Sequence, residues 1–261
     1  MEAQGRFGKL KKFGKLIAVK PLMMIYGLQW AITGPVSDQL WINRTCNVNL
    51  GYNVSICEDL SNHKNFSDEV QKQVTQYKVI GSYIENVPQI VLTLYLGPLS
   101  DRGRKLLMYI PFLGHLISGG FYLTFIYFNQ WPAQYLWIAN IYVLFGGYAV
   151  LQIAMYGYIG DVTTERERTT LMSILQGIGI AIFPLAEFLS GVIYDWGGFY
   201  AVYGFSFGFT VIGLIYICFI PESLTEKDII VPDKLVNEPM TCWTVFKKAN
   251  QSVIDSVGYV V

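Results

Sequence analysis

Six apolar runs of roughly 20 residues divide the chain, and each is long enough to cross the bilayer core of about 30 Å as a helix. They lie at about 16–41, 77–99, 106–128, 134–160, 169–194 and 199–220. Lipid offers the backbone no hydrogen-bond partners, so we expect these runs to be helical. The sequence therefore predicts an all-α membrane protein, a six-transmembrane-helix bundle.

The alternative is that these runs are buried core helices of a soluble protein. Charged residues make up only 15% of the chain, whereas soluble domains carry about 25%. Aromatic residues of the kind that anchor helices at membrane interfaces flank the runs: Trp41, Trp131, Tyr135 and Trp196. Both observations favour the membrane interpretation.

Basic residues indicate the orientation of the bundle. Fifteen of the 19 Lys and Arg fall in the N-terminus, in the turns after the second and fourth runs, and in the tail. The four on the other side are Arg44, Lys64, Lys72 and Lys78. Because basic loops stay in the cytoplasm, both termini are predicted to be cytoplasmic. The expected organisation is an N-terminus at 1–15, a membrane domain at 16–220 and a tail at 221–261.

The long loop at about 42–76 is then expected outside the cell or in a lumen. It carries three N-glycosylation sequons within 25 residues, which begin at Asn43, Asn53 and Asn65. Cys46 and Cys57 share this loop. An oxidising compartment makes a disulfide between them plausible, although either cysteine could pair with a distant loop instead.

Two charged turns lie on the predicted cytoplasmic side. The first runs Gly-Pro-Leu-Ser-Asp-Arg-Gly-Arg-Lys over residues 97–105, and it resembles the signature loop of the major facilitator superfamily. The resemblance implies close helix packing at Gly97, capping or pairing by Asp101, and contacts of Arg104 and Lys105 with helix ends and lipid headgroups. A generic basic loop is the alternative.

The second turn covers residues 161–169. We interpret its charged residues as a gate that pairs with neighbouring loops when the cytoplasmic side closes: Asp161, Arg166 and Arg168. The competing interpretation is a solvated connector.

Further motifs resemble the proton-coupled folate transporter family, solute carrier family 46. They are Thr33-Gly34-Pro35 with Gln39 and Trp41, the stretch 68–72, and Asp161-Val162 followed by Arg166-x-Arg168-Thr169. The resemblance implies the N-terminal six-helix half of a transporter in a plasma or lysosomal membrane. It also implies proton-coupled secondary transport of small organic solutes, folate-like or other organic anions among them.

Ionisable groups at membrane depth are costly, and each is a functional candidate. Glu85, His115 and Glu187 are candidates for proton coupling, because burial raises a carboxyl pKa and histidine titrates near neutral pH. Candidates for cavity contacts are Gln29, Asn86, Gln89, Asn140, Gln152 and Gln176. The alternative for every one is a structural residue that is hydrogen-bonded between helices.

Other functions are disfavoured. The formal net charge is zero, so no basic field attracts nucleic acid. No spacing typical of a metal site, a phosphate loop or a catalytic nucleophile occurs, so we expect neither an enzyme nor a cofactor.

Expected partners are a small solute, protons and the bilayer. Because six spans make half of such a transporter, we expect a truncated form that lacks, or pairs with, a second six-helix half. The alternative is a non-transporting membrane glycoprotein, or a regulatory half that pairs with a full-length relative.

Overall fold

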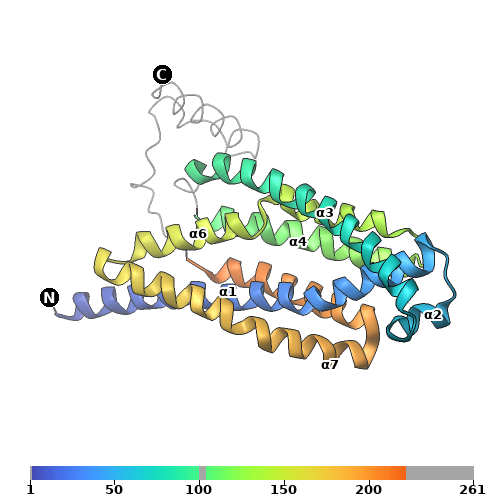
Figure 1. Cartoon of the computed structure of the whole chain (residues 1–261). Coiled ribbons are helices and arrows are strands. Elements are labelled where there is room, and N and C mark those ends of the chain that lie inside the picture. Colours follow the sequence, from blue (N-terminus) through green and yellow to red (C-terminus); the bar gives the residue numbers. More distant parts are fainter. Residues whose placement is uncertain (1, 100–103, 222–261) are drawn as a thin grey trace, which may run out of the picture.

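The computed structural model describes residues 2–99 and 104–221, and every regular element in this part of the chain is helical (Figure 1). The elements are α1 (Glu2–Arg44), η1 (Thr45–Asn49), α2 (Val54–Glu58), η2 (Leu60–Asn62), α3 (Lys64–Leu99), α4 (Arg104–Tyr127), η4 (Ala133–Tyr135), α5 (Leu136–Ala139), η5 (Asn140–Phe145), α6 (Gly147–Val162) and α7 (Glu165–Phe219). The all-α expectation is confirmed. Asp101 and the predicted tail beyond Pro221 lie outside the described residues.

The long helices run side by side along one axis, and α1 extends over the whole bundle (Figure 1). α7 has 55 residues, which would reach about 80 Å as a straight helix. It instead bends back at Gly197 and Gly198, whose backbone angles are not helical. Gly198 has φ +62°, a conformation that favours glycine because it lacks a Cβ. The bend falls between the fifth and sixth apolar runs.

The fourth apolar run is not the single helix that the sequence predicts. It is divided into η4, α5, the 3₁₀-helix η5 and α6. Gly146 lies between η5 and α6, and α6 begins at Gly147; their φ angles are +85° and +51°. Two consecutive residues with positive φ cannot continue a right-handed helix. A mid-helix 3₁₀ stretch of this kind often marks a hinge.

The interior is built from two hydrophobic clusters along the bundle. One includes Leu22, Phe112 and Met155, and the other includes Ile32 and Phe125. Helices approach closely where glycine faces a large side chain: a Cβ at Gly213 would overlap the ring of Phe112. Small residues at such crossings are typical of membrane helix packing.

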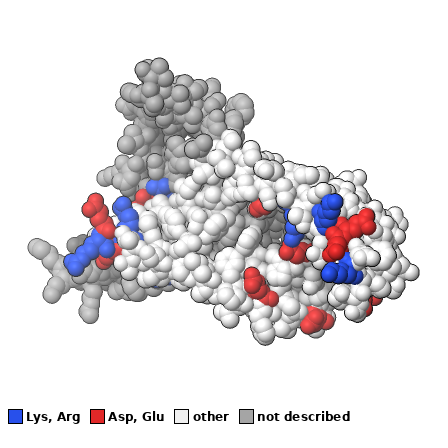
Figure 2. Space-filling view, viewed as in Figure 1, with Lys and Arg blue, Asp and Glu red and all other residues white. Residues whose placement is uncertain are grey.

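Within residues 2–99 and 104–221, three helical segments are long and apolar enough to cross a membrane: Arg104–Tyr127, Ala133–Val162 and Glu165–Phe219. Less than half of each apolar window is buried, so much of this apolar surface faces outward, as lipid-facing helices require. Figure 2 shows charged side chains gathered toward the two ends of the bundle, with a largely uncharged stretch between them. The count of six spans stays a prediction.

Candidate functional site

Two adjoining cavities lie within the bundle. The first, of about 300 Å³, is lined by α1, α3, α4, η5 and the second arm of α7. Its polar lining includes Gln29, Asp38, Lys78, Glu85, His115 and Asn140. The second, of about 380 Å³, includes Met23, Tyr26, Gln89, Tyr148, Gln176 and Phe183. Trp30, Glu85 and Tyr142 line both cavities, so the carboxyl group of Glu85 lies where the two meet.

Glu85 is positioned by α3 and by the irregular fourth run. The Tyr142 hydroxyl, on η5, donates a hydrogen bond to Glu85 Oε1. One turn before Glu85, a Cβ at Gly81 would lie 3.6 Å from the Trp137 ring, and Trp137 Nε1 donates to the Tyr77 carbonyl at 3.1 Å. The contacts of Trp137 hold the start of the fourth run against α3, and Tyr142 follows it on η5 at Glu85.

His115 joins Glu85 through aromatic neighbours. Its ring stacks on Tyr142, with centroids 4.6 Å apart. Its Nε2 lies 2.8 Å from the hydroxyl oxygen of Tyr26. The chain Tyr26–His115–Tyr142–Glu85 thus draws on α1, α4, η5 and α3. An imidazole and a carboxylate can each take up a proton.

Gln29 is 1% exposed and contributes to the first cavity. The Thr210 hydroxyl donates to its Oε1, and no partner for its Nε2 is found in the described part of the chain. Thr210 has a second acceptor, the Ser206 carbonyl at 3.0 Å, so the amide can also be turned to present its oxygen. In either orientation one polar atom of Gln29 is left for a ligand.

Gln176 lies in a separate amide cluster at the second cavity. Gln152 Nε2 donates to Gln176 Oε1 at 3.0 Å, and the Tyr156 hydroxyl donates to the same oxygen at 2.7 Å. Gln152 does not line either cavity. It therefore supports Gln176 and links α6 to α7.

Besides Gln152, two further candidates from the sequence lie outside both cavities. Glu187 is exposed on the outer surface of the first arm of α7. Asn86 is exposed on α3, where its Nδ2 donates to the Ser82 carbonyl at 2.7 Å. The structure brings Gln29, Asn140, Glu85 and His115 together in the first cavity.

Sequence reasoning missed several cavity residues. Lys78 Nζ lies 2.6 Å from Asp38 Oδ1, and both residues line the first cavity. The sequence did contain a signal for this pair, because Asp38 lies near the end of the first run and the oppositely charged Lys78 near the start of the second. Tyr26 and Tyr142 gave no signal, because aromatic residues are common throughout these runs.

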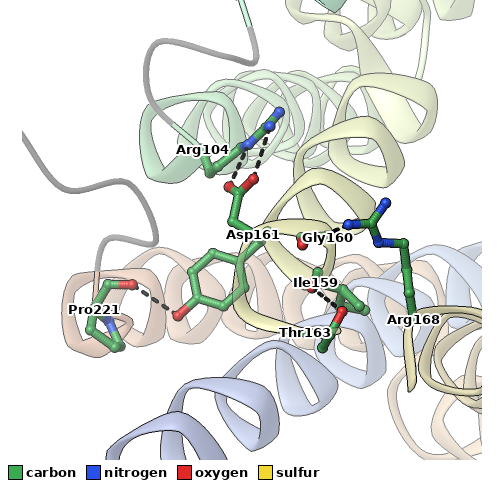
Figure 3. Close-up of polar contacts among 8 residues, drawn as sticks. Arg104, Ile159, Gly160, Asp161, Thr163, Arg168 and Pro221 are labelled. Atoms are coloured by element: carbon green, nitrogen blue, oxygen red, sulfur yellow. Dashed lines mark hydrogen bonds and ion pairs between the residues drawn. The ribbon is translucent and has the colours of Figure 1, made fainter. Parts of the chain in front are cut away.

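A second polar cluster lies at the end of the bundle where α6 ends and α7 begins (Figure 3). Arg104 makes a bidentate ion pair with Asp161, with Nε to Oδ2 at 3.0 Å and Nη2 to Oδ1 at 3.3 Å. Arg104 begins α4 and Asp161 lies in the last turn of α6. Each charge is at the unfavourable end of its own helix dipole, but close to the favourable end of its partner's helix.

Two more basic side chains also contact the C-terminal end of a neighbouring helix. Lys105 Nζ donates to the Cys218 carbonyl at 2.9 Å, near the end of α7. Arg168 Nη2 donates to the Gly160 carbonyl at 3.1 Å, near the end of α6 (Figure 3). Basic side chains from helix N-termini thus satisfy carbonyl groups that helix C-termini leave unpaired. Arg166 is exposed beside this cluster.

The loop between α1 and α3 lies at the opposite end. Cys46 and Cys57 form a disulfide. Asn49 Nδ2 donates to Gln134 Oε1 at 2.8 Å, which fastens the loop to η4. The Tyr52 hydroxyl donates to Glu69 Oε2 at 2.6 Å, and this hydrogen bond raises the pKa of Tyr52.

The three sequon asparagines of this region differ in setting. Asn53 caps α2 and is exposed, and Asn65 is exposed near the start of α3. Asn43 lies inside α1, and Thr45 of its sequon is fully buried. The first sequon is therefore the least accessible in the folded chain.

Residues 21–254 match the Major Facilitator Superfamily. The lysosomal proton-coupled steroid conjugate and bile acid symporter SLC46A3 of Gallus gallus is 26% identical over 216 residues, covering 78% of this chain and 46% of the relative. The Homo sapiens protein of that name is 28% identical over 227 residues, covering 78% and 47%. The proton-coupled folate transporter of Bos taurus is 29% identical over 187 residues, covering 67% and 39%. The chain spans about half the length of the curated relatives it matches.

Proposed function

Because the chain belongs to the Major Facilitator Superfamily, we propose that it forms part of a secondary transporter that carries a small organic solute by alternating access. The relatives named above are transporters, so the expectation that the chain is not an enzyme is confirmed. The observation that carries the proposal is the cavity in which Glu85 and His115 meet through Tyr142. Ionisable groups inside a membrane domain mark solute and proton pathways.

We further propose six passes: α1, α3, α4, the interrupted fourth run, and the two arms of α7. The bend at Gly197 and Gly198 supports the last two, because it reverses the direction of the chain. The end that carries Arg104, Lys105 and Arg168 would face the cytoplasm, as basic residues favour. The end with the disulfide loop would face the outside or a lumen, in a plasma or lysosomal membrane.

Proton coupling is proposed for Glu85 and His115. A proton on either group would change the charge of the cavity as the solute enters or leaves. Glu187 has a weaker claim, because its exposed side chain lies away from both cavities.

The pair of Arg104 and Asp161 is proposed as part of the gate. It fastens the start of α4 to the end of α6, while the glycines at 146 and 147 offer α6 a hinge at its other end. Opening would separate the pair as α6 tilts.

The test is uptake by proteoliposomes that contain this chain, alone and together with a full-length relative. A panel of anionic, neutral and cationic solutes is offered with and without an inward proton gradient. We expect saturable uptake that the gradient accelerates. Uptake of none of the solutes would refute transport, and equal uptake without the gradient would refute proton coupling.

One observation favours a second function, a regulatory half that pairs with a full-length relative. α3 exposes a row of large apolar side chains: Val79, Tyr83, Val87 and Ile90. Such a surface suits packing against further membrane helices. Copurification with the relative, without uptake by the pair, would favour this function over transport.

A further inference from the structure

Among the described residues, the two cavities hold one carboxyl group that pairs with no lysine or arginine, that of Glu85, and His115 is a further titratable group of the first cavity. Of the ionisable groups in the first cavity, Lys78 and Asp38 are already paired with each other at 2.6 Å. The second cavity is lined by Glu85 and by no lysine or arginine among the described residues. Glu85 therefore has no cationic partner in the part of the chain that the structure describes.

Glu85 also has room for a ligand. The Tyr142 hydroxyl is the one hydrogen-bond donor to its carboxyl group found among the described residues, and it occupies Oε1. A carboxylate has about four lone-pair sites on its two oxygens. Because Glu85 lines both cavities, its remaining acceptor positions are open to a molecule in either one.

The walls around this carboxylate are aromatic. Trp30 and Tyr142 line both cavities, and Tyr26, Tyr148 and Phe183 line the second. The rings of Trp30 and Phe183 meet edge to face with centroids 5.3 Å apart. The faces of aromatic rings attract cations, and most strongly where water is excluded. The same faces repel an anion.

Gln29 adds a neutral polar contact. Its amide is buried at the first cavity with one polar atom unpaired. It can present its oxygen to an ammonium group, because the Thr210 hydroxyl has the Ser206 carbonyl as an alternative acceptor.

We propose that the two cavities that meet at Glu85 bind a protonated organic amine with an aromatic or apolar body. The ammonium group lies at Glu85, and the body lies against Trp30 and Tyr142. The inference rests on the proposed function only in taking these cavities as the solute site. It differs from the carboxylate solutes, bile acids and folate, in the names of the relatives.

The test uses the purified full chain in detergent at pH 7.5, where a histidine with an ordinary pKa is neutral. Three ligands of similar size are titrated by saturation-transfer NMR: 2-phenylethylamine, 2-phenylethanol and 3-phenylpropionate. They carry an ammonium, a hydroxyl and a carboxylate on the same ring and linker. We expect the amine to bind at least about tenfold more tightly than the alcohol, and the carboxylate to bind most weakly.

The matched variants are Glu85→Gln and Glu187→Gln. Each removes one carboxylate and preserves its size, but Glu187 lies outside the cavities. Glu85→Gln is expected to abolish the tenfold preference for the amine, and Glu187→Gln to retain it. Circular dichroism checks that both variants fold.

Equal or tighter binding of 3-phenylpropionate by the unmodified chain would overturn the proposal, as would binding of none of the three ligands. An amine preference that survives in folded Glu85→Gln would also overturn it. If Glu85→Gln does not fold, the ranking of the three ligands on the unmodified chain still decides. Binding of the amine without any uptake would refute transport and leave this inference standing.

Discussion

The ion pair between Arg104 and Asp161 allows a quantitative test of how the bundle is fastened at the proposed gate. The side chains are 11% and 21% exposed, so water screens the pair only partly. Two unit charges 3.0 Å apart attract by about 5–6 kcal/mol at an effective dielectric of about 20. Desolvation of both groups offsets much of this attraction.

We expect Asp161→Asn to destabilise the protein by about 2–3 kcal/mol. This is below the roughly 3–5 kcal/mol for breaking a fully buried pair, because water reaches Arg104 in the variant. Arg104→Gln should give a similar loss. In the double variant the losses should fall short of additive by about 1.5–2 kcal/mol, which lies in the lower part of the range for a hydrogen bond to a charged group.

The assay is reversible unfolding in mixed detergent micelles, followed by circular dichroism for the two single variants and the double variant. Arg166→Gln is the matched control, since this exposed basic residue lies at the same end of the bundle. Its effect should stay within about 0.5 kcal/mol. Additive losses, with a coupling energy below about 0.5 kcal/mol, would show that the pair behaves as a solvated surface contact and would refute the reasoning.

Three further outcomes are expected. Gly157→Ala should cost about 1–3 kcal/mol in unfolding free energy and remove the coupling of Asp161 to Arg104, because the new Cβ would lie 2.9 Å from Arg104 Nε. The control is Gly177→Ala, which has open space at its Cβ and should be neutral or stabilising by up to about 1 kcal/mol. Phe112→Ala should cost about 3–5 kcal/mol in the same assay, because the ring is fully buried, and a loss below about 1 kcal/mol would contradict this packing. In cells, Asn53→Gln and Asn65→Gln should each remove one glycan, seen as faster gel migration before glycosidase treatment, whereas Asn43→Gln should not, since Thr45 is buried.

Several features of the fold follow from local sequence alone. The apolar runs at 106–128 and 169–194 are long enough to dictate helices, because a backbone in lipid must satisfy its own hydrogen bonds. The separation of charged ends from an apolar middle follows from the order of residues along the chain, and Figure 2 shows the same separation on one face of the folded chain. The closeness of Cys46 and Cys57 in sequence favoured the disulfide that the structure contains.

Other features depend on dihedral angles that apolarity does not reveal. The fourth run reads as one uninterrupted helix, yet Gly146 and Gly147 adopt positive φ and divide it. Glycines inside apolar runs also serve as plain packing positions, as Gly213 does against Phe112. The residue type alone does not separate the two uses.

The sequence by itself determined that this chain forms apolar helices, that most of its basic residues lie outside the apolar runs, and that isolated carboxylates lie inside them. Only the tertiary structure decided which of these carboxylates lines a cavity. Glu85 and Glu187 are alike in sequence, but Glu85 faces Tyr142, 57 residues away, whereas Glu187 faces outward. Likewise, Tyr26 meets His115 across 89 residues. The physical reason is that periodicity within one helix defines its faces, whereas the neighbours that cover each face are set by how the whole bundle packs.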